Sequence, residues 1–506
     1  MFTKKVYKIL NFIVVAGLLL FFLLPFALTA GENRSAFDIT GVGYRINDWL
    51  EKHALNLRER AIMGFRLNVM GISPHKLIHM GKDGWVFYTA DYNLELPRGT
   101  YPLTQDIKDR LLYNVQKATD FYGGIGADFY YVLSPSKTTV YPEYIAGENL
   151  RIAETAIDIL TDYINENANV NVVNTKAGVI AQKEYGKAFP FYETHWSDLG
   201  AYGAYKAILD KFNENGYDMK PIQVRFEDGP YDNLFEEVLK APGLFGGGEV
   251  APKVIYDAKA RVVNDGDYYD ALMKICEKYT IEDRGAPAVV LFENPTAKYG
   301  TLLIQADSQF VTRNCVITRY LAEHFKRTYY VYTGPITELV PELAEFMRPD
   351  VVMFSNAERT IAILPTEQFS LIPEKPDDTD ISSFPPADPS NGGMIYFDTV
   401  NEQILSADTL SIGDDLTVRI AGYAYDDILK QPLSALYIHL GDTLYKCQYG
   451  IERADVASFY NVPTLVKTGF RVSIPKSAFE GCQTIEAIGI SANGEFRYAP
   501  KVYAVD

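Results

Sequence analysis

The chain has 506 residues, of which 47% are hydrophobic and 22% charged, and its formal net charge is −17, from 48 Lys and Arg against 65 Asp and Glu. The length indicates about two to four domains, and the hydrophobic share excludes a mostly disordered protein. A strongly acidic chain repels phosphate backbones. We therefore expect no nucleic-acid partner.

The N-terminus has the pattern of an export segment, residues 1–30. Lys4, Lys5 and Lys8 precede an almost uninterrupted apolar run, Ile9–Ala30. The basic flank predicts that the lysines stay in the cytoplasm. The run is long enough to span a bilayer, and no clear Ala-x-Ala cleavage site follows it, which favours a retained membrane anchor over a cleaved signal peptide. In both cases the remaining chain is expected outside the cytoplasm, at the cell surface or in the periplasm.

A polar, glycine-containing stalk is expected at residues 31–45, followed by an α/β domain over residues 46–372. Thr104 opens an amphipathic helix that ends at Gly123-Gly124, and the apolar run Phe129–Leu133 after it is typical of a buried strand. Short buried strands alternating with helices predict a parallel sheet covered on both faces. Further predicted strands are Val289–Phe292, Thr301–Gln305, Tyr329–Tyr332 and Val351–Phe354, and further predicted helices are Val311–Phe325 and Thr337–Met347.

The composition changes after this domain. Residues 373–393 are rich in proline and aspartate, which indicates a stiff linker. Residues 394–506 contain alternating runs such as Ala435–Leu440 and Phe470–Ile474, without a recognisable helix, and we predict a β-sandwich. Four tyrosines of this region are expected to be exposed, where they would stack on sugars or pack across strands: Tyr437, Tyr445, Tyr449 and Tyr460.

The four cysteines leave two alternatives open. Cys276 and Cys315 lie mid-chain, and Cys447 and Cys482 lie near the end, so one disulfide in each half is compatible with the sequence. Equally, all four can be small buried hydrophobic residues.

Among the six histidines, His195 has the surroundings of a catalytic base. It lies in the polar and aromatic stretch Tyr192–Asp198, just before a helix that begins near Gly200. In an extended segment residues two apart point to one side, so Glu193 would lie beside His195 and orient its imidazole. His75 and His79 are four apart but carry no metalloprotease carboxylate between them, and we expect no metal site there.

Ser308 is the candidate nucleophile. It follows the predicted strand Thr301–Gln305 and precedes a helix. The carboxyl end of a parallel strand that leads into a helix is where α/β folds place reactive groups. The alternative is that Asp307 or Ser308 only caps the helix, and the pattern alone favours capping.

Several motifs together resemble the DHHW group of SGNH-hydrolase-like proteins, related to the alginate acetylation proteins AlgX and AlgJ. The motifs follow the order of that group between Gly81 and Arg359. They are Gly81–Tyr88, Pro135–Lys137 with Tyr141-Pro142, Glu193–Trp196, Ala306–Ser308, and Asp350–Val352 with Glu358-Arg359.

The resemblance implies a flavodoxin-like, three-layer α/β/α domain that acts on acetyl groups of an exopolysaccharide or cell-wall glycan, without metal or organic cofactor. It implies Ser308 as nucleophile, His195 as base and Glu193 as the residue that orients it. The chain departs from the family motifs at Glu193, where the family has aspartate, and at Ala306, where it has glycine.

Four further residues are candidates for substrate binding: Asp307, Trp196, Lys137 and Arg359. For Lys137 the alternative is a surface lysine, and for Arg359 an ion pair at the end of the sheet. Asn294 is a possible oxyanion donor or a turn residue before Pro295.

We therefore expect a membrane-anchored O-acetyltransferase or acetylesterase with a polysaccharide substrate. The resemblance implies a membrane-bound acyltransferase as a partner that delivers the acetyl group. The alternative is a catalytically inactive glycan-binding or scaffold protein.

Overall fold

The computed structural model describes residues 55–70, 72–147, 150, 154–231, 234–239, 244–245, 248–277, 289–332, 339–362, 372–388, 392–405, 407–413 and 417–506. The predicted anchor and stalk, residues 1–45, lie outside this part of the chain. Within the described residues, no helix has the length and apolar character needed to cross a membrane.

The larger unit is built on a seven-stranded sheet with the spatial order β4-β3-β11-β9-β10-β8-β7. The first five of these strands are mutually parallel, whereas β8 is antiparallel to β10 and β7 is antiparallel to β8. In the same order the strands are Asn171–Asn174, Asp128–Ser134, Val351–Ala357, Tyr299–Ala306, Phe325–Tyr332, Val289–Glu293 and Arg261–Val263.

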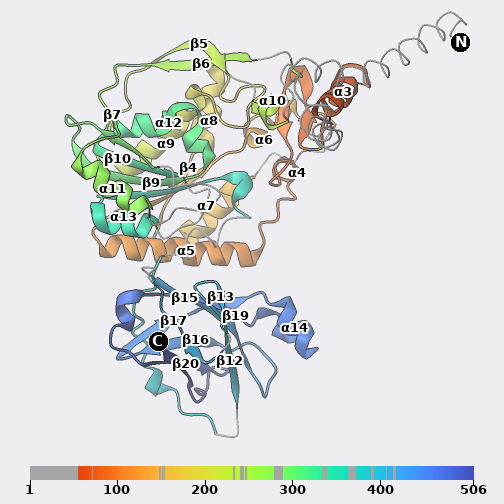
Figure 1. Cartoon of the computed structure of the whole chain (residues 1–506). Coiled ribbons are helices and arrows are strands. Elements are labelled where there is room, and N and C mark those ends of the chain that lie inside the picture. The colour runs from red at the N-terminus through yellow and green to blue at the C-terminus, as the bar shows by residue number, and fades with distance from the viewer. Residues whose placement is uncertain are drawn as a thin grey trace, which may run out of the picture.

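Helices cover both faces of this sheet (Figure 1). One face packs against α8 (Lys176–Ala181), α9 (Asp198–Glu214) and α12 (Ser308–Ala322). The other packs against α5 (Gln105–Gly124), α7 (Ala156–Asn167), α11 (Asp267–Glu277) and α13 (Leu339–Met347). Alternate side chains explain this arrangement, since Tyr130 and Val132 of β3 enter the first core and Tyr131 enters the second. The predicted α/β domain with helices on both faces is therefore present.

The strand order differs from the flavodoxin-like order that the resemblance implies. Numbered along the chain, the five parallel strands have the spatial order 2-1-5-3-4, whereas flavodoxin has 2-1-3-4-5. The last strand, β11, inserts between β3 and β9 because its backbone pairs with both. This places the ends of three motif-bearing strands side by side.

The boundaries of the predicted elements are mostly close to the observed ones. The helix expected after Thr104 is α5, and the Thr104 hydroxyl caps it by accepting a bond from the Ile107 amide. The predicted helix Val311–Phe325 extends too far. The helix α12 ends at Ala322, and Phe325 instead begins β10, where it pairs with Tyr299 of β9.

Smaller elements complete the larger unit. Its helices are α3 (Leu55–Asn68), α4 (Glu95–Arg98), α6 (Lys137–Val140) and α10 (Leu234–Val238). It also has a hairpin, β1 (Ile78–Met80) with β2 (Val86–Tyr88), and an antiparallel pair, β5 (Arg225–Tyr231) with β6 (Glu249–Ile255), whose strands are separated along the chain by α10.

The C-terminal part forms two five-stranded sheets whose side chains share one hydrophobic core. The first sheet has the order β13 (Gln403–Ile404), β12 (Gly393–Val400), β15 (Thr417–Asp426), β19 (Gly469–Pro475) and β18 (Gln448–Ile451). The second has the order β14 (Thr409–Leu410), β21 (Lys501–Val505), β20 (Thr484–Ile490), β16 (Ala435–Leu440) and β17 (Thr443–Lys446).

Two expectations for this part are wrong. A helix is present, α14 (Ala454–Tyr460), which the sequence pattern did not reveal because it is short and buries only Val456. Tyr437 and Tyr445 are buried rather than exposed, and the Tyr449 hydroxyl donates to the Ala424 carbonyl. These three tyrosines therefore have packing or hydrogen-bonding roles within the sheets.

The three cysteines whose side chains the structure describes are free thiols. Cys276 and Cys447 are buried and Cys482 is half-buried, while the side chain of Cys315 lies outside the described part. The alternative of a Cys447–Cys482 bridge is thereby excluded.

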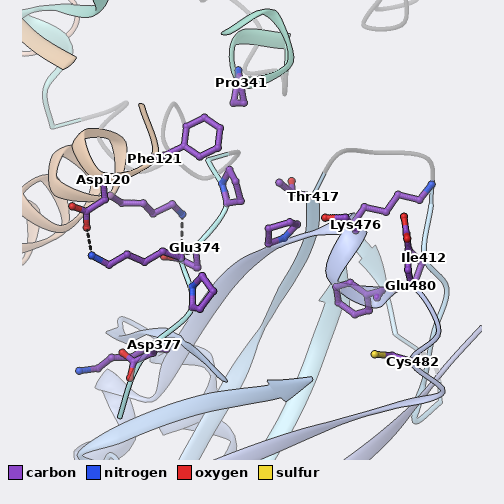
Figure 2. A pocket seen from close by; sticks show the side chains of 18 of the residues that line it. Asp120, Phe121, Pro341, Glu374, Asp377, Ile412, Thr417, Lys476, Glu480 and Cys482 are labelled. Carbon is purple, nitrogen blue, oxygen red and sulfur yellow. Dashed lines mark hydrogen bonds and ion pairs between the residues drawn. The ribbon is translucent and has the colours of Figure 1, made fainter. Parts of the chain in front are cut away.

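The two units meet along α5, which separates them in Figure 1. Glu374 accepts from Lys117 Nζ at 2.7 Å and from Tyr113 Oη at 2.8 Å, and Lys375 pairs with Asp120 at 2.7 Å. Beside these contacts lies a cavity of about 1120 Å³, lined by α5, the segment after Pro373 and the C-terminal sheets (Figure 2).

Candidate active site

Ser308 lies at the carboxyl end of β9, as the first residue of α12. The preceding Asp307 is the helix cap, since its Oδ1 accepts from the Gln309 amide at 2.9 Å. Its second oxygen accepts from the Ala357 amide at the end of β11, at 2.6 Å. Both carboxylate oxygens of Asp307 are thus engaged with backbone, and the Ser308 hydroxyl is not the cap.

His195 lies in the loop before α9 and reaches Ser308 across 113 residues of sequence. Its Nε2 is 3.0 Å from Ser308 Oγ. The loop ends at Ser197, whose hydroxyl caps α9 by accepting from the Gly200 amide. The start of α9 therefore fixes the backbone close to the imidazole.

Glu193 completes a chain of three side chains. Its Oε1 lies 2.7 Å from His195 Nδ1 and also accepts from the amides of Thr194 and His195, at 2.8 and 3.2 Å. Glu193 is 1% exposed. With Nδ1 bonded to the carboxylate, the neutral imidazole carries its proton there and Nε2 can accept from a hydroxyl. The three side chains thus have the spacing that a nucleophile, its base and an orienting acid would require.

Both departures from the family motifs are accommodated. The longer Glu193 side chain folds back onto the amides of its own loop. Ala306 is the last residue of strand β9, its φ is not positive, and its methyl group packs in the core. Neither residue removes a polar group from the site.

The residues considered for substrate binding are mostly buried. Trp196 packs against Phe310 with ring centroids 5.8 Å apart, and Arg359 lies 3.9 Å from Asp91. Lys137 is not a surface lysine, because only 3% of it is exposed. The carboxylate of Asp307 is bonded to backbone amides. The contacts of all four residues therefore favour roles in holding the surrounding backbone and side chains in place.

Asn294 lies outside this arrangement. Its side chain donates to the Glu323 carbonyl at 3.1 Å and accepts from Thr296, which is the turn role. His79 is on strand β1 and not on a helix with His75. Among the described residues, no cluster of three or more His, Cys, Asp or Glu side chains is placed to hold a metal ion.

Two acids beside the site, the half-buried Glu249 and the buried Glu358, are not among the residues that the sequence analysis selected for chemistry. Glu249 of β6 accepts from the Phe191 amide with both oxygens at 2.7 Å, just before the loop that carries Glu193 and His195. Glu358, after β11, accepts from the Ser136 amide at 3.1 Å, and burial raises the pKa of its carboxyl. Glu249 lies in a region without a recognisable sequence pattern. Glu358 belongs to a family motif, but nothing in the sequence indicates its contact with Ser136.

Comparisons with known proteins agree with the motifs. Residues 78–253 match the family described as "SGNH hydrolase-like domain, acetyltransferase AlgX". The chain resembles the AlgX- and AlgJ-like proteins. The curated "Probable alginate O-acetylase AlgJ" of Pseudomonas putida is 26% identical over 200 residues, which are 38% of this chain and 50% of that protein. The chain thus spans about half the length of this relative.

Solved structures of the same group are also similar. The O-acetyltransferase domain of Pseudomonas putida AlgJ is 16% identical, with a TM-score of 0.37. The matched region covers 56% of this chain and 92% of the AlgJ domain. Pseudomonas aeruginosa AlgX is 11% identical, with a TM-score of 0.41. The matched region covers 84% of this chain and 89% of the AlgX chain.

Proposed function

We propose that the protein is an extracytoplasmic O-acetyltransferase or acetylesterase that acts on an exopolysaccharide or cell-wall glycan. The observation that supports this most directly is the hydrogen-bonded series Glu193–His195–Ser308, with 2.7 and 3.0 Å between its polar atoms. The series lies at the carboxyl ends of parallel strands, beside the N-terminus of a long helix. The similar proteins named as acetyltransferases give the acyl group its proposed identity.

In the proposed first step, Ser308 Oγ attacks the carbonyl carbon of an acetyl donor while His195 Nε2 takes the hydroxyl proton. The carboxylate of Glu193 stabilises the imidazolium through Nδ1. Backbone amides and the positive end of α12 stabilise the oxyanion that forms. The leaving group then takes the proton from His195, and Ser308 carries the acetyl group as an ester.

The second step reverses these roles. His195 removes the proton of a sugar hydroxyl, whose oxygen attacks the acetyl-serine carbonyl and releases Ser308 Oγ, which regains a proton from His195. The product is an O-acetylated sugar. If water takes the place of the sugar hydroxyl, acetate is released and the protein is an esterase. The exclusion of water from the acyl-enzyme would separate the two activities.

The surroundings of the reaction are part of the proposal. Residues 9–30 would anchor the chain in the cytoplasmic membrane, and a membrane-bound acyltransferase would supply the acetyl group. The two C-terminal sheets, which share one core, would form the proposed β-sandwich domain.

The test incubates the full chain in detergent with p-nitrophenyl acetate. Turnover is measured as the release of nitrophenolate, and acetylation of the protein is measured by intact mass spectrometry. We expect an acetyl adduct and turnover, both lost in Ser308→Ala, and turnover lost in His195→Ala. Ser382→Ala and His439→Ala are matched controls, because Ser382 is exposed and His439 lies on the C-terminal strand β16.

Each outcome has a distinct meaning. Activity that persists in both site variants would place the chemistry elsewhere. Neither adduct nor turnover in the unmodified protein would favour the inactive glycan-binding protein. If the protein is active, addition of candidate glycans separates a transferase from an esterase by the mass of the sugar product.

A further inference from the structure

A buried lysine lies directly beneath the catalytic loop. Lys137 opens the short helix α6 after strand β3, and it is 3% exposed. Its Nζ donates to three backbone carbonyl oxygens, those of Val86 at 2.8 Å, Phe191 at 2.7 Å and Glu193 at 3.1 Å. The contacts of this ammonium group are therefore with the protein's own backbone.

The number of contacts matches the chemistry of the group. A lysine ammonium has three N–H donors and no acceptor, and here each donor has one carbonyl. A buried charge is tolerated only when such partners replace its water. The rings of Trp85 and Phe87 lie 5.1 and 5.4 Å from Nζ and close off the remaining space.

The three carbonyls belong to two segments that meet at the site. Val86 begins β2, while Phe191 and Glu193 belong to the loop that leads into His195. The Val86 amide also donates to the Phe191 carbonyl, at 3.2 Å. Lys137 thus joins the hairpin, the end of β3 and the backbone of the orienting acid.

We propose that Lys137 is a positioning residue, whose ammonium group fixes the backbone at Phe191 and Glu193 so that the carboxylate of Glu193 meets His195. This inference rests on the proposed function of Ser308, His195 and Glu193. It replaces the expectation that Lys137 binds substrate, because Nζ is enclosed and its donors are used.

The protonation state of Lys137 then affects the loop. Burial lowers the pKa of Lys137 to about 7, and the nearby carboxylates of Glu249 and Glu193 oppose this shift. A neutral amine has two N–H donors for three carbonyls, so the loop loses one bond as the pH rises through this value. The titratable groups on the elements packed against Lys137 include Tyr88 on β2, Glu193, Tyr192 and His195 on the loop, Lys187 before it, Glu236 on α10 and Glu249 on β6.

The first experiment compares Lys137→Met with the unmodified full chain in detergent, using p-nitrophenyl acetate. Methionine keeps the length of the side chain but has no charge and no donors. We expect kcat to fall roughly 10- to 100-fold with KM nearly unchanged, because a small displacement of a catalytic group has an effect of this size. We also expect the decline of kcat above about pH 7 in the unmodified protein to be absent from the variant.

Lys183→Met is the matched control. Lys183 Nζ also donates to a backbone carbonyl, that of Val140 at 2.8 Å, and pairs with Glu143, but it is partly exposed and does not bond the catalytic loop. Its kcat should stay within about twofold of the unmodified protein. An equal loss in both lysine variants would overturn the proposal.

A second measurement does not depend on turnover. The nitrogen-bound proton of His195 that bonds Glu193 is followed by NMR, and in the unmodified protein we expect its signal to change near pH 7 with the titration of Lys137. The signal should be shifted or lost in Lys137→Met. An invariant signal, together with kcat that is flat from pH 6 to about 10.5, the ordinary pKa of a lysine, would overturn the proposal even if Lys137→Met did not fold.

The two measurements separate the inferences. If the unmodified protein shows no turnover, the proposed function fails, and the NMR signal alone decides whether Lys137 positions the Glu193–His195 pair. If turnover is present and insensitive to Lys137→Met, the proposed function stands and the role of Lys137 is wrong.

Discussion

At the scale of single residues, the geometry of Glu193 depends on its length. Its Oε1 meets one imidazole nitrogen and two amides of the same loop, all within 3.2 Å. A side chain one methylene shorter would withdraw the oxygen by about 1.5 Å. The loop cannot easily follow, because Lys137 and Glu249 hold it at Phe191 and Lys137 also at Glu193.

We therefore predict that Glu193→Asp, the residue of the family motif, lowers kcat roughly 10- to 100-fold, since the carboxylate no longer reaches Nδ1. Glu193→Gln keeps the length but removes the charge and favours the wrong tautomer, and we expect a loss on the order of 10⁴-fold. The measurement is kcat for p-nitrophenyl acetate, with thermal unfolding as a check on folding. If kcat of Glu193→Asp equals that of the unmodified protein, the loop adapts to either acid.

At the scale of elements, the first turn of α9 lies against the loop that precedes it. A Cβ atom on Gly200 would lie 2.2 Å from the Ala188 carbonyl oxygen and 2.9 Å from the Trp196 Cβ. The Ala188 carbonyl also accepts from the Ser197 amide at 2.8 Å, so Ala188 cannot move away from Gly200 without weakening this bond. This close contact sets the direction in which the chain leaves His195 and enters the helix.

We predict that Gly200→Ala destabilises the protein by about 1–3 kcal/mol, because the added methyl overpacks this contact, and that it lowers kcat. Gly123→Ala is the control. Gly123 lies near the end of α5 with nothing within 4 Å of the added Cβ, and alanine there should stabilise by about 0.5–1 kcal/mol. Urea unfolding measures both. Equal stability of the two variants would mean that α9 shifts freely along the loop.

The elements also show what the sequence could and could not predict. Strands β3, β9 and β11 each contain a short apolar run, and α5 begins at a threonine cap and ends at two glycines, so local patterns were sufficient. The end of α12 was not predicted, because an apolar Phe325 fits a helix as well as the strand that pairs with β9. The position of β11 between β3 and β9 in the sheet depends on pairing between strands that are distant in sequence. Local sequence patterns carry no information on such pairing.

The same distinction holds for the site. Ser308 and His195 were selected by a strand end and by motifs, and the structure brings them to 3.0 Å, while their catalytic roles stay predictions. For Lys137 the sequence indicated substrate binding or a surface position, whereas its side chain is buried. Its carbonyl partners are 51, 54 and 56 residues away along the chain, and no local pattern encodes such contacts.

At the scale of the whole molecule, Glu374 links the two units. Its amide donates to the Ser473 carbonyl of β19 at 2.6 Å, so its backbone belongs with the C-terminal sheets. Its carboxylate instead pairs with Lys117 and Tyr113 of α5. The side chains of Lys117 and Glu374 are 7% and 9% exposed. This ion pair is therefore largely removed from water, unlike the Lys375–Asp120 pair beside it, whose side chains are 72% and 36% exposed.

We predict that Lys117→Met costs about 3–5 kcal/mol of unfolding free energy, because it leaves the buried carboxylate of Glu374 without its cation. The double variant Lys117→Met/Glu374→Met should recover much of this loss, since an apolar pair of similar size replaces the ions. Urea unfolding of the four proteins of this cycle gives the coupling energy.

Lys375→Met is the matched control on the same interface, and we expect it to cost at most about 1 kcal/mol, because exposed pairs contribute little. If Lys117→Met and Lys375→Met have equally small effects, backbone contacts such as that of Glu374 with Ser473 would dominate the junction. If only Lys117→Met is costly, the buried pair sets how α5 meets the C-terminal sheets, and with it the shape of the cavity between the two units.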